Sequence, residues 1–224
     1  MSLICANIPT TPGRQMAARR GTMISLLTAL LIVFVSAGSV MAASVAKYVS
    51  APNSDMVITG TSTLHNWSAK STSLVGGVTL TGHWANDAKS IRLRSIHLTI
   101  PVKSLKSSEG GGMDNTMYNA LNSPQHSSIS YQLTDAALDN AAAKPGESAV
   151  FDAAGTLTVN GVARPITLKL LVTRHHESIS ISTSTTLKMT DFGVKPPTAM
   201  FGIIRSGNVI TVTAKWRLVK KAGT

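Results

Sequence analysis

Six histidines are the side chains of this chain best suited to metal binding or proton transfer. Zinc sites commonly draw ligands from one helix or strand at a short spacing, as in His-Glu-x-x-His. No such spacing occurs here, and the neighbours His175 and His176 would point to opposite faces of a strand. A site assembled from distant positions is the alternative, but we expect no metal and no other cofactor. The six are His65, His83, His97, His126, His175 and His176.

Groups for other kinds of catalysis are sparse. The chain has no Gly-x-Ser-x-Gly nucleophile turn and no P-loop, and its 10 acidic residues form no evident pair for acid–base work. Asp191 stands beside Phe192-Gly193, an arrangement more typical of a turn or cap than of a catalytic acid. Gly110–Gly112 could cradle a phosphate through backbone N–H groups, but the nearby Asp114 weakens that reading. We therefore expect no catalytic residue and no enzyme.

The N-terminal part has the pattern of a secretory signal peptide. Three arginines precede an apolar run over residues 23–40, which small residues end. We expect residues 1–42 to be removed and residues 43–224 to form an exported, periplasmic domain; an uncleaved anchor helix is the alternative. Cys5 is the single cysteine and lies in the predicted signal peptide, so the exported domain would contain no disulfide and no reactive thiolate.

The charge balance favours anionic partners. The chain has 21 basic and 10 acidic residues, a net charge of +11, and without the three N-terminal arginines 18 basic residues face the same 10 acidic ones. Such a surplus attracts phospholipid head groups, pyrophosphates or nucleic acid. The cations are dispersed, however, and aromatic residues make up only 4%, too few for a stacking platform. We expect no nucleic acid partner, and transient contact with an anionic membrane surface stays open beside an ordinary solvated surface.

One stretch combines a histidine with one of the three tryptophans: Gly60-Thr61-Ser62-Thr63-Leu64-His65-Asn66-Trp67. It follows the apolar run Met56-Val57-Ile58. These residue types suit a strand that leaves an apolar interior, where an indole ring packs while its N–H finds a partner. Trp67 is therefore a candidate for either the core or a ligand site, with His65 as the polar group beside it.

The elements that must position these residues are β-strands. Apolar and polar residues alternate most clearly over residues 166–173, 178–189 and 210–218, as in antiparallel sheets with one buried face. Within residues 91–100 the alternation changes phase by one residue, which predicts a β-bulge near Arg94-Ser95. We find no linker or repeat, so we expect one domain, a sandwich or a barrel. Further strands are expected at residues 56–63, 65–71, 76–84, 91–100, 127–134 and 148–159.

A short helix should interrupt the strands after Gly110–Gly112. Asp114 is a fair N-cap for it, and its apolar residues share one face. The glycines would let the helix move as a lid, whereas closing one end of a barrel is the plainer role, and the two are compatible. Asn160-Gly161 is a plausible hairpin signal, although residues 162–164 would make the loop longer than a two-residue turn. Residues 136–145 are expected to form an alanine-rich connection.

Four stretches carry a resemblance to a known family: Gly60–Trp67, Met113–Leu121, Gly155–Ile166 and Met189–Val194. The last two are the most specific, because a Gly-Thr-Leu-x-x-Asn-Gly run rarely recurs by chance. On these stretches the chain resembles the YceI-like family of bacterial periplasmic proteins. The resemblance implies an all-β fold, a single eight-stranded antiparallel lipocalin-like β-barrel with a short helix near one end. It also implies an apolar interior that holds an isoprenoid or another long-chain lipid, with its polar head near the mouth.

The resemblance also directs attention to residues that could bind this lipid. His65 and Arg205 are the candidates for the head group, and the methionines suit a pocket that adapts to a flexible chain. The variant Leu64-His65-Asn66-Trp67 departs from the simplest family members, which affects the identity of the ligand more than the fold. The candidate lining residues, each of which could equally be core, are Leu64, Trp67, Met113, Met117, Tyr118, Leu121, Phe192, Met200 and Phe201.

Three functions follow as hypotheses. The favoured one is a non-catalytic lipid or isoprenoid carrier of the cell envelope, for carriage, storage or stress protection. The second is an envelope stress or interaction protein with no ligand in the barrel. The third is a hydrolase-type enzyme that uses His65 as a base. The sequence leaves the oligomeric state open, a homodimer included.

Overall fold

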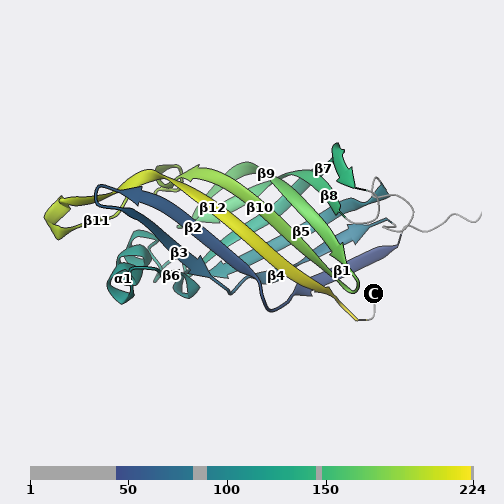
Figure 1. Ribbon diagram of the computed structural model, residues 1–224, viewed down its shortest axis with the longest axis horizontal. Helices are drawn as coiled ribbons and strands as arrows, with labels where there is room; N and C mark the ends of the chain where they lie inside the picture. Colours follow the sequence, from purple (N-terminus) through teal and green to yellow (C-terminus); the bar gives the residue numbers. More distant parts are fainter. Residues whose placement is uncertain (1–43, 83–89, 145–147, 223–224) are drawn as a thin grey trace, which may run out of the picture. The chain divides into compact units, whose positions relative to one another are not determined.

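The computed structural model describes residues 44–82, 90–144 and 148–222, with only the backbone for residues 140–144, 199 and 200. Met41–Thr224 form one compact unit. The elements of this unit (Figure 1) are β1 (Val45–Ser50), β2 (Asp55–Ser62), β3 (Asn66–Ser71), β4 (Val75–Thr81), β5 (Arg92–Pro101), η2 (Val102–Ser104), β6 (Lys106–Ser107), α1 (Gly111–Ala120), β7 (Ser128–Lys144), β8 (Ser148–Val159), β9 (Val162–His175), β10 (Ser178–Lys188), η3 (Met189–Phe192), β11 (Thr198–Ala199), η4 (Met200–Gly202) and β12 (Ile204–Lys220).

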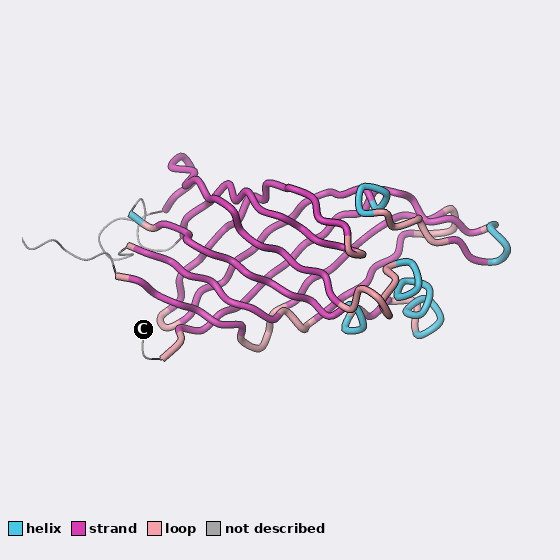
Figure 2. The backbone as a smooth tube through the Cα atoms, turned by 180° about the vertical axis from the view of Figure 1, so that it is seen from behind, coloured by secondary structure: helices cyan, strands magenta, loops and turns pink. Residues whose placement is uncertain are grey.

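Eight strands close into an antiparallel barrel. Around the ring the order is β1-β4-β5-β7-β8-β9-β10-β12, and β1 pairs with β12 to close it. The closing pairs join Tyr48–Ser50 to Leu218–Lys220. Figure 2 shows the strands of the near and far walls crossing one another. Closure removes the unpaired edges of an open sheet, and the expected all-β, eight-stranded antiparallel barrel is confirmed.

Toward the end that carries α1, different strands form the barrel wall. There β12 pairs with β2 instead of β1, and β3 and β6 follow β2 in order. The helix α1 follows β6 in the chain and lies beside it (Figure 1). The expected short helix near one end of the barrel is therefore present.

The predicted bulge in β5 is confirmed. Thr79 of β4 faces Ser95 and Leu80 faces Leu93, so Arg94 is the extra residue. The one-residue change of phase in the sequence corresponds to this insertion, because a bulge exchanges the two faces of a strand.

The alanine-rich connection expected over residues 136–145 is wrong, since β7 continues to Lys144. Ala137 pairs with Asp152 of β8, and Leu138 pairs with Phe151. Ala136 and Leu138 are partly buried against the core. Alanine is a weak strand former, so here the pairing with β8 and the packing of one face outweigh local preference.

The hairpin expected at Asn160-Gly161 is confirmed, but its expected loop length is wrong. Both residues take positive φ (50° and 73°) and Val159 pairs directly with Val162, which leaves a two-residue turn. The expected role of Asp114 is also wrong. Asp114 does not cap α1, which has Gly110 as its N-cap. Its carboxylate instead accepts a hydrogen bond from the backbone of β6.

One end of the barrel is filled by a layer of side chains. Its members come from strands far apart in the sequence, and the register places Leu80 beside Leu93 and Ile179 beside Leu218 on neighbouring strands. The largest of them lose all contact with solvent, so this layer supplies much of the hydrophobic stabilisation. The fully buried large residues include Phe151, Leu80, Ile91, Ile179 and Leu218.

Candidate ligand-binding cavity

Beyond this filled layer the barrel encloses an apolar cavity that extends toward α1. The volume that the centre of a water-sized sphere can occupy is about 190 Å³. The whole atom-free volume, which includes the opening to solvent, is about 1590 Å³. A single buried water needs roughly 10–15 Å³ by the first measure. The cavity therefore has room for a slender organic molecule rather than for isolated waters.

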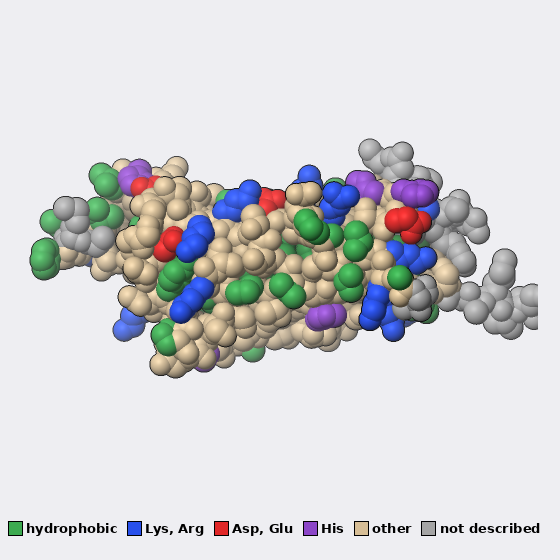
Figure 3. Space-filling view, turned by 90° about the horizontal axis from the view of Figure 1, so that it is seen from below, with side chains coloured by type: hydrophobic (Ala, Val, Ile, Leu, Met, Phe, Trp, Pro, Cys, Tyr) green, Lys and Arg blue, Asp and Glu red, His purple; other side chains and the backbone are tan. Residues whose placement is uncertain are grey.

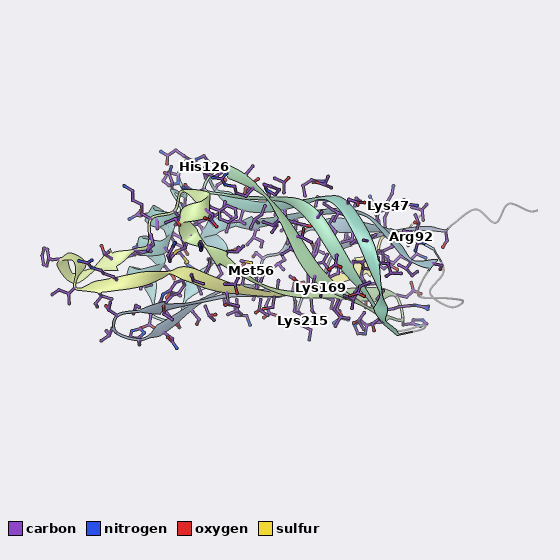
Figure 4. The ribbon with its side chains drawn as sticks, turned by 90° about the horizontal axis from the view of Figure 1, so that it is seen from above. Lys47, Met56, Arg92, His126, Lys169 and Lys215 are labelled. Atoms are coloured by element: carbon purple, nitrogen blue, oxygen red, sulfur yellow. The ribbon has the colours of Figure 1, made fainter. Side chains whose placement is uncertain are left out.

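The cavity wall follows from the alternation of the strands. Every second residue of β9, β10 and β12 faces inward, as the period-2 pattern of the sequence predicts. Met56 of β2 is buried and lines the cavity, whereas Lys169 and Lys215 are exposed on the wall (Figure 4). The residues of these three strands that line the cavity include Ile166, Leu168, Leu170, Ile181, Thr183, Thr185, Leu187, Ile210, Val212, Ala214 and Trp216.

The helix α1 covers one side of the cavity near its opening. Met113, Met117 and Leu121 line the cavity from this side. Methionine side chains are unbranched and polarizable, so they adapt to ligands of different shape. Gly110, Gly111 and Gly112 precede them, and a Cβ at any of these positions would meet nothing within 4 Å. Side chains could therefore be added at the start of the helix without a clash, while Met117 and Leu121 pack against the core.

A polar cluster ties α1 to β6. Asp114 is only 8% exposed, and its carboxylate accepts hydrogen bonds from the Ser107 N–H (2.7 Å) and from Lys106 Nζ (3.2 Å). The Ser107 N–H is the main reason that the pKa of Asp114 lies below its ordinary value, and Lys106 adds to the effect. Lys106 Nζ also donates to the Tyr118 hydroxyl (3.0 Å), which raises the pKa of Lys106. The Tyr118 hydroxyl lies 2.7 Å from the Leu105 carbonyl oxygen, to which it donates.

The segment η3 closes another part of the cavity. Phe192 is buried and lines the cavity. Its carbonyl oxygen lies 3.5 Å from Asn160 Nδ2, and Arg164 Nε donates to the Asp191 carbonyl oxygen (2.9 Å). Gly193 ends η3 in the left-handed conformation (φ 67°), which favours glycine. The two most specific sequence stretches thus meet, and together they position Phe192.

Few polar groups reach the cavity wall. The hydroxyl oxygen of Thr183 is buried and has no hydrogen-bond partner among the described residues. The hydroxyl of Tyr131 donates to the Ala153 carbonyl oxygen (3.1 Å), and burial raises the pKa of Tyr131 to about 12. Tyr131 therefore stays neutral in the cavity wall at physiological pH.

A smaller, more polar pocket adjoins the opening. It shares Trp67 and Met113 with the main cavity. His65 lies here, with Nδ1 2.8 Å from the Asn66 carbonyl oxygen and Nε2 3.7 Å from a carboxylate oxygen of Glu109. The lining also includes the hydroxyl residues Ser62, Thr116, Thr198 and Ser206, together with Pro197 and Ile204. The arrangement can offer several hydrogen bonds to a polar group at the mouth.

The structure brings five of the predicted lining residues together. They come from β3, α1, the residue after α1 and η3, and they surround the open part of the cavity. These five are Trp67, Met113, Met117, Leu121 and Phe192.

The other predicted residues lie elsewhere. The expected cavity-facing position of Leu64 is wrong, because its side chain is 66% exposed in the turn between β2 and β3. Phe201 and Arg205 are also exposed outside the cavity lining. Tyr118 packs against the core, and its hydroxyl accepts a hydrogen bond from Lys106 of β6. The side chain of Met200 lies outside the described residues.

Most of the cavity wall was absent from the predicted site. Residues such as Leu168, Val212 and Ala214 were recognised only as the apolar faces of strands. The alternation shows which residues face the inside of a barrel. It does not show which of them line a cavity and which pack against one another.

Within the described residues, no three histidine, cysteine or acidic side chains gather as metal ligands. In that same part of the chain no helix has the length and apolarity to span a bilayer.

Comparison with solved structures finds proteins that share this fold. The polyisoprenoid binding domain from Saccharophagus degradans implicated in plant cell wall breakdown superposes with a TM-score of 0.59 at 16% identity, covering 80% of this chain and 100% of that one. BcnA of Burkholderia cenocepacia gives 0.55 at 15% identity, with 73% and 95% covered. The Campylobacter jejuni YCEI protein gives 0.51 at 15% identity, with 68% and 84% covered. At these identities the likeness shows a shared fold.

Family membership rests on the sequence. A comparison with curated proteins gives no match. The YceI-like domain, however, matches residues 48–217, which include all eight strands of the ring in whole or in part. The chain therefore belongs to the YceI-like family.

Proposed function

We propose that this protein binds an isoprenoid or another long-chain lipid in the barrel cavity, without chemical turnover. The observation that carries the proposal is the cavity itself, which is lined almost wholly by apolar side chains from Met56 to Trp216. A similar barrel from Saccharophagus degradans is described as a polyisoprenoid binding domain. An apolar, narrow and deep space suits a flexible hydrocarbon chain better than a compact polar substrate.

Affinity would come mainly from burial of the chain. Each CH₂ group removed from water contributes about 0.8 kcal/mol before ordering costs. A lipid tail of several isoprene units can therefore bind firmly without a strong polar contact. The hydroxyl oxygen of Thr183 is buried in the wall without a partner among the described residues, and it would favour a ligand that places a polar atom at that depth.

The polar head would lie in the smaller pocket at the mouth. His65 and the hydroxyls of Ser62 and Ser206 line that pocket, and they suit a head group that forms hydrogen bonds. Arg205 is exposed close by, since its backbone N–H donates to Thr63 Oγ1 (3.2 Å). In this proposal His65 is a head-group contact rather than a base.

We include export in the proposal, on the strength of the N-terminal pattern in residues 1–42. The mass of the protein recovered from the periplasm of its host would test this part. A mass that retains residues 1–42 would contradict a cleaved signal peptide.

Organic extraction of the purified protein followed by mass spectrometry tests the central claim. We expect one prenyl or acyl lipid to be recovered at a constant ratio to protein. The variant Ala214→Phe places a ring in the cavity and should lose that lipid. The matched variant Thr213→Phe places the same ring on the exposed face of the same strand and should keep it. Repeated recovery of an empty barrel, with no thermal shift on adding polyprenyl alcohol, would contradict the proposal.

A further inference from the structure

The end of the barrel with the cavity opening carries a group of exposed apolar side chains. Leu64 is 66% exposed, Ile203 74% and Phe201 110%, more than in an extended reference chain. We call these three residues the apolar tip. Leu64 lies in the turn between β2 and β3, and the other two lie between β11 and β12. In Figure 1 the segment with β11 forms one extremity of the barrel unit, and Figure 3 shows hydrophobic side chains gathered at that end.

Hydrogen bonds join the two turns that form the apolar tip. The Thr63 N–H donates to the Arg205 carbonyl oxygen (3.0 Å), and Thr63 Oγ1 donates to the Ile203 carbonyl oxygen (3.2 Å). The Ser206 N–H donates to the Pro197 carbonyl oxygen (2.9 Å), which closes the second turn. These bonds hold the two turns side by side, so the three apolar residues project from the same end of the barrel.

The conformation of Phe201 adds a second, independent observation. Its φ of 54° and ψ of 31° place it in the left-handed region, which a non-glycine residue occupies at a cost of roughly 1 kcal/mol or more. Because the Phe201 side chain is exposed, hydrophobic burial within the chain does not offset this cost. Backbone strain combined with an exposed aromatic ring is typical of residues whose contact lies outside the chain.

The apolar tip is continuous with the mouth of the cavity. The smaller pocket is lined by Thr198 and Ile204, which flank the second turn, and by Trp67, which also lines the main cavity. A molecule that leaves the cavity toward the tip would therefore meet apolar side chains on the way. This path joins the cavity to whatever the tip contacts.

We propose that the apolar tip inserts into the surface of an anionic phospholipid bilayer and aligns the cavity mouth with the lipid. The proposal rests on the proposed function, since a lipid carrier must exchange its ligand with a membrane. Arg205 lies two residues beyond Ile203 and is exposed, and Lys195 is exposed in the segment that leads to β11. Aromatic and aliphatic side chains with cations beside them are typical of segments that bind an anionic interface.

Fluorescence of a single labelled cysteine tests this in the full chain. In a Cys5→Ser background, Phe201→Cys carries an environment-sensitive dye, and Gln132→Cys carries it on the exposed wall of β7 as the control. The fraction of protein bound to vesicles does not measure insertion of the apolar tip, because the apolar run over residues 23–40 could attach any variant to a vesicle. The local environment of each dye is therefore the measurement.

With vesicles of phosphatidylglycerol and phosphatidylcholine, we expect a several-fold rise in emission at position 201 and none at position 132. The rise should persist in high salt, since insertion of apolar groups is not screened as ion pairs are. Substituting Leu64→Ser and Ile203→Ser beside the dye should reduce the rise. An unchanged signal at position 201 would overturn the proposal. So would a rise that depends on protein concentration without vesicles, because a second copy would then cover the tip.

The two proposals fail separately. If the dye inserts but extraction yields an empty barrel, the cavity ligand is wrong and the membrane surface stands. If a lipid is extracted but the dye does not respond, the tip proposal alone is wrong.

Discussion

The indole ring of Trp67 lies against Gly60, its partner across the β2–β3 pair. A Cβ built at Gly60 would stand 2.6 Å from Trp67 Cε2, closer than real side-chain contacts allow. The indole N–H donates to the Thr61 carbonyl oxygen (3.0 Å), which fixes the ring along β2. The position of Trp67 at the cavity mouth thus depends on the absence of a side chain at Gly60.

Replacing Gly60 by Ala should displace the ring and lower the free energy of unfolding by about 1–3 kcal/mol, as overpacking does. Urea unfolding measures the change, and tryptophan fluorescence reports the altered environment. Gly112→Ala is the matched control, because the added methyl group meets nothing within 4 Å and a helical alanine should raise the stability by about 0.5–1 kcal/mol. A Gly60→Ala protein as stable as the wild type, with the same fluorescence, would contradict this account of the contact.

Acid should weaken the attachment of α1 through Asp114. The pKa of Asp114 is lowered in the folded state, chiefly by the Ser107 N–H, so the unfolded chain binds the proton more readily. The stabilisation is therefore complete above the ordinary carboxyl pKa of about 4, and it is lost as the pH falls through the lower folded value. Urea unfolding across this range should show a difference between wild type and Asp114→Asn that shrinks on acidification. The exposed Asp191→Asn serves as control, and a difference independent of pH would contradict the assignment.

The buried hydroxyl of Thr183 should cost stability in the empty barrel. Thr183→Val keeps the shape and removes the unpartnered oxygen, so the free energy of unfolding of the lipid-free protein should rise by about 1 kcal/mol. Thr213→Val is the control on the outer face, where the hydroxyl lies 3.2 Å from Ser184 Oγ and the change should stay within about 0.5 kcal/mol. If Thr183→Val destabilises the protein more than Thr213→Val, the hydroxyl has a partner such as a bound water.

The fold was largely predictable because the strands have one buried and one wet face. Val212 and Ala214, which alternate with polar residues in the sequence, face the inside of the barrel. The change of phase near Arg94 corresponds to the β-bulge in β5. The errors concern places where tertiary contacts outweigh local preference. Ala137 is in a strand because β8 pairs with it, and Asp114 serves β6 instead of capping its own helix.

The candidate site was predictable only in part. Trp67 and Phe192 belong to distinctive stretches, and both line the cavity. Leu64 and Phe201 are equally apolar, yet they project from turns, and composition does not tell an inward from an outward turn residue. That these residues also contact a ligand is a prediction, which the variant Ala214→Phe and lipid extraction test.

The filled end of the barrel gives the cavity a floor. Trp216 lies at this floor, with its indole N–H donating to Ser50 Oγ (3.0 Å), and Ile179 and Leu218 stand fully buried behind it. A lipid that enters tail first would stop there, so the depth of the cavity would limit the length of tail that fits. Lipids with the same head group would then be sorted by tail length: short tails would leave part of the wall uncovered, and long tails would hold the head away from the mouth.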